Sequence, residues 1–194
     1  MINHIKAALN EAAKVLSNLS NNSETLDSIQ TAAHRFAYTF SSGNRVFSCG
    51  NGGSMCDAMH FAEELSGKFR KTRAGLAATA ISDPGHISCI ANDFGYEEIF
   101  SRYLESHARK GDALLAISTS GKSPNICKAA KTALKKSVMV VALTGRSGSL
   151  LGELADIEIC TPGGGFADRS QELHIKVIHI LIEMIERQLF PHNY

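Results

Sequence analysis

Five short apolar runs alternate with longer amphipathic stretches along this 194-residue chain, and no other feature constrains its fold as strongly. The runs predict strands at residues 45–49, 77–81, 113–117, 138–143 and 157–160. Strands that alternate with helices run parallel, with right-handed crossovers and helices on both faces of the sheet. The sequence therefore predicts an α/β fold in which a five-stranded parallel sheet forms the middle layer of an αβα sandwich.

Two amphipathic stretches, residues 4–20 and 23–40, precede the first strand and predict a helix pair. We expect a single domain over residues 1–194, with a helical extension at 1–42 and the αβα core at 43–194. A single sheet layer does not need both helices. Their excess of apolar surface favours packing against another subunit, with core packing as the alternative.

Charge and cysteine content exclude several classes of protein. Twenty Lys and Arg residues against nineteen Asp and Glu residues give a formal net charge of +1. This balance argues against nucleic-acid binding and against a polybasic membrane anchor, and no apolar run approaches the ~18 residues of a membrane span. Five scattered cysteines without a CxxC pair, and no signal sequence, indicate reduced thiols in the cytoplasm.

Two of the predicted strands run directly into polar loops that contain glycine, at residues 50–54 and 118–123. Ligands of open parallel sheets bind at the carboxyl ends of the strands. Glycines allow the backbone to approach a ligand, while hydroxyls and helix N-terminal amides donate to an anion. The second loop has four hydroxyl residues and suits a phosphomonoester; ordinary turns and helix caps are the alternative. Neither loop has the spacing of a dinucleotide or ATP motif.

Three further groups of residues are candidates for the chemistry. His60 and Glu64 are four residues apart and share a helix face, which suits a metal, an acid/base pair or a plain solvated pair. Asn92 and Asp93 follow the second strand and could contact sugar hydroxyls or form a turn. The histidines of the apolar last helix, predicted at 168–190, are either core residues or functional.

The two loops resemble those of the sugar isomerase (SIS) family of phosphosugar domains. The segments 57–65, 91–95 and 167–179 resemble, more narrowly, the phosphoheptose isomerase family. The resemblance implies a homotetramer with active sites at subunit interfaces. It also implies an aldose–ketose isomerase that converts sedoheptulose 7-phosphate to D-glycero-D-manno-heptose 7-phosphate, the first step toward ADP-heptose and the lipopolysaccharide core.

The resemblance also implies roles for individual residues. Glu64 and His179 match the acid/base pair, with Glu64 handling the proton at carbon and His179 the proton at oxygen. One zinc ion per subunit would be bound by His60, Glu64, Gln171 and His179. The residues implied in substrate binding are Asn51, Gly52, Gly53, Ser54, Glu64, Asn92, Asp93, Ser118, Thr119, Ser120, Ser123, Asp168 and Gln171.

Helix geometry limits this zinc site. Gln171 and His179 are eight residues apart, which is about 12 Å along a regular helix and roughly 80° around it. Either the last helix begins after Gln171, or the ligands of one ion come from different subunits. We expect the second arrangement.

Two other functions compete with this interpretation. One is a non-catalytic SIS protein that binds the bacterial replication initiator, and the other is an isomerase of a different ketose phosphate. A binding platform needs neither Glu64 nor His179, so the presence of both favours the enzyme.

Overall fold

The computed structural model describes residues 1–194 and confirms the α/β fold. Its five strands form one parallel sheet in the order β2-β1-β3-β4-β5. The strands are β1 (Val46–Gly50), β2 (Ala78–Ala80), β3 (Ala113–Ser118), β4 (Met139–Thr144) and β5 (Ile157–Cys160). The order changes direction between β1 and β3, which are neighbours in the sheet.

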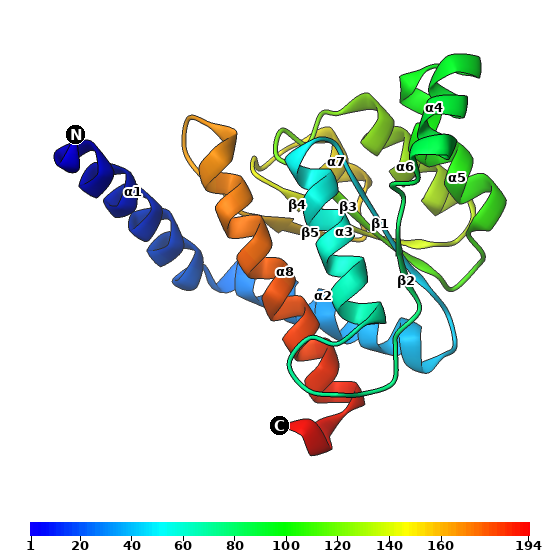
Figure 1. Ribbon diagram of the computed structural model, residues 1–194, viewed down its shortest axis with the longest axis horizontal. Coiled ribbons are helices and arrows are strands. Elements are labelled where there is room, and N and C mark those ends of the chain that lie inside the picture. The colour runs from blue at the N-terminus through cyan, green and yellow to red at the C-terminus, as the bar shows by residue number, and fades with distance from the viewer.

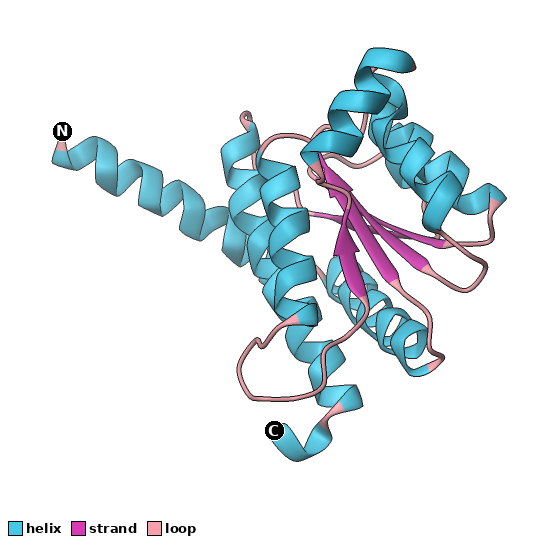
Figure 2. Ribbon diagram, turned by 45° about the vertical axis from the view of Figure 1, so that its right-hand side comes forward, coloured by secondary structure: helices cyan, strands magenta, loops and turns pink.

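Helices cover both faces of the sheet, as Figures 1 and 2 show. The helices are α1 (Ile2–Ser20), α2 (Ser23–Ser41), α3 (Gly53–Ser66), α4 (Pro84–Asp93), α5 (Ile99–His107), α6 (Pro124–Lys135), α7 (Leu150–Leu154) and α8 (Ala167–Leu189). Two short 3-10 turns, η1 (Tyr96–Glu98) and η2 (Pro191–Asn193), complete the elements. None of the helices has both the length and the hydropathy that a membrane crossing requires.

Alternate strand residues divide between two apolar cores. Val46 and Leu115 pack with α2, α3 and α8 on one face, whereas Phe47 and Leu114 pack with α5, α6 and α7 on the other. Strands buried on both faces are uniformly apolar, which explains why they appear in the sequence as continuous runs. The predicted αβα sandwich is confirmed.

The two N-terminal helices differ in how they pack. Helix α2 buries Ile29, Ala33 and Phe36 in the core beside α8. Helix α1 projects from the body of the molecule and buries only Leu19 (Figure 2). Only α1 therefore stands outside the core, although the sequence predicted both helices as the extension 1–42. The apolar face of α2 continues over its whole length, and burial of that face fixes its place.

The connection between β2 and β3 contains two helices that the sequence analysis did not assign. Asp83 accepts a hydrogen bond from the His86 amide at 2.7 Å, and Pro84 occupies the first position of α4. An Asp cap followed by Pro is a helix-start signal, although it also resembles a turn. Helix α5 then buries Phe100 and Leu104 against the sheet.

His174 of α8 is a core residue, which settles one of the two alternatives for the histidines of this helix. Its side chain is completely buried, and neither ring nitrogen has a hydrogen-bond partner. Burial lowers the pKa of His174 to about 4, although the nearby carbonyl of Thr144 acts in the opposite direction. The imidazole is therefore neutral at physiological pH.

We expect this histidine to make the protein sensitive to acid. An unfolded histidine has a pKa of about 6.5. As the pH falls from about 6.5 to about 4, the unfolded state takes up a proton first, so the free energy of unfolding decreases by up to about 3 kcal/mol. In urea unfolding between pH 4 and pH 8, a His174→Leu variant should lose this part of the pH dependence. His4→Gln, at an exposed site on α1, is the control. An unchanged pH dependence in His174→Leu would contradict the assignment.

Candidate active site

The two glycine-containing loops meet at the carboxyl ends of β1 and β3, where the strand order changes direction. The side-chain amides of Asn51 and Asn125 exchange two hydrogen bonds, of 2.9 Å and 2.8 Å, and so join the loops. The Tyr96 hydroxyl donates to Asn51 Oδ1 at 3.1 Å. Such a switch point is the usual ligand site of an open α/β sheet. Asn125 was missed by sequence reasoning, although it lies only two residues after the serine loop.

Three hydroxyls converge in the serine loop, residues 118–123. The nearly buried Ser118 places its Oγ 3.1 Å from Ser123 Oγ and 3.5 Å from Ser120 Oγ. Ser123 precedes α6, but its side chain does not cap that helix. The three hydroxyls are therefore arranged as donors to one anion. Of the first amides of α6 only that of Asn125 can join them, because residue 124 is proline and the Ile126 and Cys127 amides donate to Asn125 Oδ1 and the Ser123 carbonyl. Ser120 also closes a turn by accepting a hydrogen bond from the Lys122 amide at 3.2 Å, so the turn alternative describes part of the loop.

A small cavity of about 160 Å³ lies between the serine loop and the start of α8. Its lining residues are Thr119, Ser120, Gly145, Arg146, Gly164, Phe166, Ala167 and Ser170. Arg146 supplies a cation that sequence reasoning missed; its only signal was its position two residues after the end of β4. Asp168 lies nearby at the exposed start of α8, where its carboxylate accepts from the Arg169 amide at 2.9 Å. No hydrogen bond joins Asp168 to the serine loop.

The glycine loop brings α3 close to α8. Gly52 has a φ of +55°, in the left-handed region that favours glycine. A Cβ atom on Gly53 would lie 2.4 Å from Nε2 of Gln171. Ser54, which follows, is buried in the first turn of α3. Gln171 therefore packs against the first turn of α3, beside the loop in which the sequence predicted substrate contacts.

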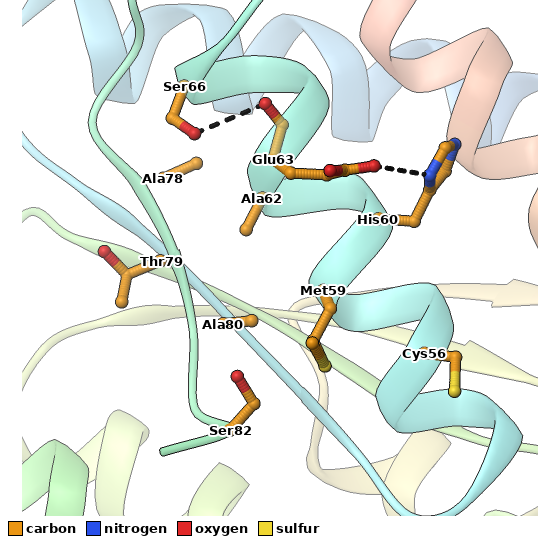
Figure 3. Close-up of a pocket in the computed structure, with 10 residues that line it drawn as sticks. All are labelled: Cys56, Met59, His60, Ala62, Glu63, Ser66, Ala78, Thr79, Ala80 and Ser82. Atoms are coloured by element: carbon orange, nitrogen blue, oxygen red, sulfur yellow. Dashed lines mark hydrogen bonds and ion pairs between the residues drawn. The ribbon is translucent and has the colours of Figure 1, made fainter.

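Further along the same two helices, His60 of α3 meets His179 of α8. Their Nε2 atoms are 2.8 Å apart, and Glu64 Oε1 lies 3.7 Å from His60 Nε2. On the other side of the ring, Glu63 Oε1 is 3.0 Å from His60 Nδ1, and Figure 3 shows this carboxylate pointing at the imidazole. A carboxylate at Nδ1 fixes the proton there and leaves Nε2 with a lone pair. Burial, and then the proximity of His60, lowers the pKa of His179.

This cluster has the donor set of a zinc site. The ligand atoms of His60, Glu63 and Glu64 lie within 4.8 Å of one another, and His179 adds a second imidazole. Zinc binds imidazole nitrogen and carboxylate oxygen, and catalytic sites keep a position open for substrate. His60, Glu64 and His179 can therefore supply three ligands from one chain.

Gln171 does not join this cluster within the chain. Helix α8 begins at Ala167, so the alternative that it begins after Gln171 is wrong. Gln171 and His179 lie on one continuous helix, about 12 Å apart along its axis. The fourth predicted ligand is therefore two turns away from the other three.

Asn92 and Asp93 lie at the exposed end of α4, where the side-chain amide of Asn92 donates from Nδ2 to Asp93 Oδ1 at 2.7 Å. The structure does not join either residue to the glycine or serine loop by a hydrogen bond. Tyr96, three residues after Asp93, does reach Asn51, so this connection approaches the loops through a residue that sequence reasoning missed. The only sequence signal for Tyr96 was that it is an aromatic residue directly after Gly95.

Asp57 is an acid whose importance appears only in the structure. It lies on α3 one turn before His60, half-buried, and its Oδ2 atom is buried without a hydrogen-bond partner. Burial raises the pKa of Asp57 to about 6, while the charge of His60 acts in the opposite direction. A carboxyl with a pKa near neutrality can exchange protons at physiological pH.

Known proteins resemble this chain over nearly its whole length. The family profile described as "SIS domain" matches residues 9–145. Proteins named phosphoheptose isomerase from Yersinia enterocolitica and from Enterobacter sp. strain 638 are 55% identical over 95% of this chain and 96% of their own. The phosphoheptose isomerase GmhA from Neisseria gonorrhoeae superposes with a TM-score of 0.88 at 31% identity, over 95% of this chain and 97% of that one. A phosphoheptose isomerase from Francisella tularensis superposes with a TM-score of 0.90 at 30% identity, over 96% and 98%.

The contact between Gly53 and Gln171 predicts an energetic coupling. Gly53→Ala alone should change the free energy of unfolding by less than about 1 kcal/mol, because only the flexible end of Gln171 must move. Adding Gln171→Ala should relieve the overlap and give a coupling of about 0.5 kcal/mol or more. A double-mutant cycle by urea unfolding measures this coupling. Gly165→Ala, where an added Cβ meets nothing within 4 Å, is the control. Additive effects of Gly53→Ala and Gln171→Ala would contradict the contact.

Proposed function

Because the chain belongs to the SIS-domain family and, within it, to the phosphoheptose isomerases, we propose that it interconverts sedoheptulose 7-phosphate and D-glycero-D-manno-heptose 7-phosphate. This is an aldose–ketose isomerisation, and it begins the synthesis of ADP-heptose for the lipopolysaccharide core. The observation that carries the proposal is the meeting of His60 and Glu64 with His179 between two helices. A protein that only bound a phosphosugar would need no such group of proton carriers.

The reaction moves one proton between two neighbouring carbons. Glu64 removes the proton from C1 of the ketose, which leaves an enediolate, and returns it to C2. His179 carries the second proton, from the C1 hydroxyl to the oxygen at C2, so that the carbonyl moves from C2 to C1. The lowered pKa of His179 keeps its imidazole neutral, and a neutral ring can both give and accept a proton.

The phosphate of the sugar binds in the serine loop. The Ser118, Ser120 and Ser123 hydroxyls converge there, and the Asn125 amide at the start of α6 can add a further donor. Arg146, in the adjacent cavity, contributes a positive charge. These groups bind a single phosphate although the chain as a whole is close to neutral.

We also propose that His60, Glu64 and His179 hold a zinc ion. When bound, zinc polarises the carbonyl and hydroxyl oxygens of the substrate as a Lewis acid. A carboxylate that binds the metal is a weaker base, and an imidazole nitrogen that binds the metal cannot take up a proton. Zinc binding therefore opposes the proton-carrying roles of both Glu64 and His179. Glu63 orients the His60 ring for this role through the 3.0 Å contact with its Nδ1 atom.

The site is proposed to be shared between subunits of a homotetramer, with Gln171 of one subunit completing the zinc site of another. Its two-turn separation from His179 on one helix supports this arrangement. Exposed apolar residues of α1, Ile5, Leu9 and Leu16, offer surface for assembly. A groove of about 410 Å³ between α2 and α8 offers a second apolar surface.

We place the protein in the cytoplasm, which suits five unpaired cysteines and a sugar phosphate substrate.

Replacing Glu64 should separate chemistry from binding. Glu64→Gln keeps the size of the side chain but removes its basicity, so turnover of sedoheptulose 7-phosphate should fall by a factor of about 10³ or more. Binding of the phosphosugar, measured by calorimetry, should change by less than about tenfold because the phosphate loop is intact. Near-normal turnover would refute the role of Glu64. If the unaltered protein bound a replication initiator tightly without any turnover, the non-catalytic alternative would replace the enzyme.

Mixed oligomers test the sharing of the zinc site. Gln171→Ala chains and Glu64→Ala chains should each be inactive and should each bind zinc more weakly, measured by competition with a chromophoric chelator. Co-expression should restore both zinc binding and turnover, because some mixed sites then combine intact Gln171 with intact Glu64. Glu64→Ala mixed with His60→Ala is the matched control, since both residues belong to the same chain's cluster. No restoration in the mixture of Gln171→Ala and Glu64→Ala chains, or equal restoration in the control mixture, would contradict the proposed sharing.

A further inference from the structure

The connection between α3 and β2, residues 67–77, runs from the carboxyl-terminal end of α3 past the last turns of α8 (Figures 1 and 2). Arg73 lies in the middle of it with a completely buried side chain. Its guanidinium donates from Nη2 to the Glu64 carbonyl at 2.7 Å and from Nη1 to the carbonyls of Leu65 and Gly67 at 2.7 and 2.8 Å. The last carbonyls of a helix have no partner within the helix, and a cation is favoured there. Arg73 therefore closes the end of α3.

The same guanidinium binds α8. Arg73 Nε donates to Glu186 Oε1 at 2.7 Å, and the Glu186 side chain is also completely buried. The other oxygen of that carboxylate, Oε2, accepts from the Tyr194 hydroxyl at 2.7 Å. Burial and this hydrogen bond raise the pKa of Tyr194 to about 12, so the hydroxyl remains a donor. A buried ion pair is tolerated when the groups around it supply hydrogen bonds, and here each guanidinium nitrogen and both carboxylate oxygens have at least one partner.

The C-terminal turn covers this pair. After α8, the chain turns back through η2, and Asn193 donates from Nδ2 to the Thr72 carbonyl at 3.4 Å. The Phe190 ring lies 5.9 Å from the Arg73 guanidinium. The end of the chain thus excludes water from the ion pair and links it to the connection that carries Arg73.

The ion pair is continuous with the cluster of proton carriers. The Glu64 carbonyl that Arg73 binds belongs to the proposed base, and Glu186 lies seven residues after His179 on α8. In the same connection, the Phe69 ring packs on the His179 ring with centroids 5.8 Å apart. Arg70 adds an ion pair of 2.8 Å with Glu183 of α8.

We propose that Arg73 is a positioning residue for the reaction. By binding the end of α3 and Glu186 of α8 together, it sets the position of one helix along the other and so places Glu64 against His179. Tyr194 supports it by holding the Glu186 carboxylate. The inference rests on the proposed function, because the geometry it maintains is that of the proposed acid/base pair.

Arg73→Lys tests this role, since lysine keeps the charge but cannot reach two helices with a fork of donors. We expect kcat to fall by about 10²-fold, with KM within about twofold because the phosphate loop is unchanged. Amide hydrogen exchange should rise by about tenfold or more in residues 62–67 and remain unchanged in α6. A purely structural role would slow turnover only in proportion to the loss of folded protein, which circular dichroism measures.

Tyr194→Phe provides a milder second variant, because it removes one hydrogen bond and keeps the ring. Like Arg73→Lys, it should lower kcat, here by about three- to tenfold. If Arg73→Lys fails to fold, Tyr194→Phe alone tests the positioning role. Arg102→Lys, in an exposed ion pair with Glu105 on α5, is the matched control and should match the unaltered protein. Folded variants at Arg73 or Tyr194 with unaltered kcat and exchange would overturn the positioning role alone. No turnover by the unaltered protein would overturn the proposed function and the positioning role with it.

Discussion

The packing of α3 along α8 is the contact on which the candidate site depends. Three contacts between the helices follow one another along their length: Gly53 with Gln171, His60 with His179, and the end of α3 with Glu186 through Arg73. Glycine at the first point leaves room for the end of the Gln171 side chain, and the buried ion pair at the last is stabilised by the hydrogen bonds around it. Between these two ends, the two imidazoles meet at hydrogen-bond distance, because each helix is held in a fixed position along the other.

The sheet has a different role, which is to bring together the groups that we propose hold the phosphate. Parallel strands deliver their following loops to one edge, and the change of direction between β1 and β3 leaves that edge open there. The reciprocal amide pair of Asn51 and Asn125 then holds the two loops together. A chain with a net charge of +1 can bind an anion in this way, because hydroxyls and amides replace a basic surface.

Sequence reasoning succeeded where a local pattern had one physical meaning. The three central strands, β1, β3 and β4, were predicted because each is buried on both faces, and the serine loop because its hydroxyls follow a strand directly. Reasoning fell short for Asn125, Arg146 and Tyr96, since each is an ordinary polar or aromatic residue until the fold brings it to a loop. It also left open whether α2 packs in the core or against another subunit, because an amphipathic stripe does not say which surface will cover it.

The sequence by itself determined the αβα fold, the two loops, and the pairing of His60 with Glu64 on one helix face, because these follow from spacing along a strand or a helix. Only the tertiary structure decided which histidine of α8 lies in the candidate site. His174 and His179 are five residues apart in similar apolar surroundings, yet one is enclosed in the core and the other faces α3. The partnership of Arg73 with Glu186, 113 residues apart, likewise depends on two helices ending side by side, which no local pattern encodes.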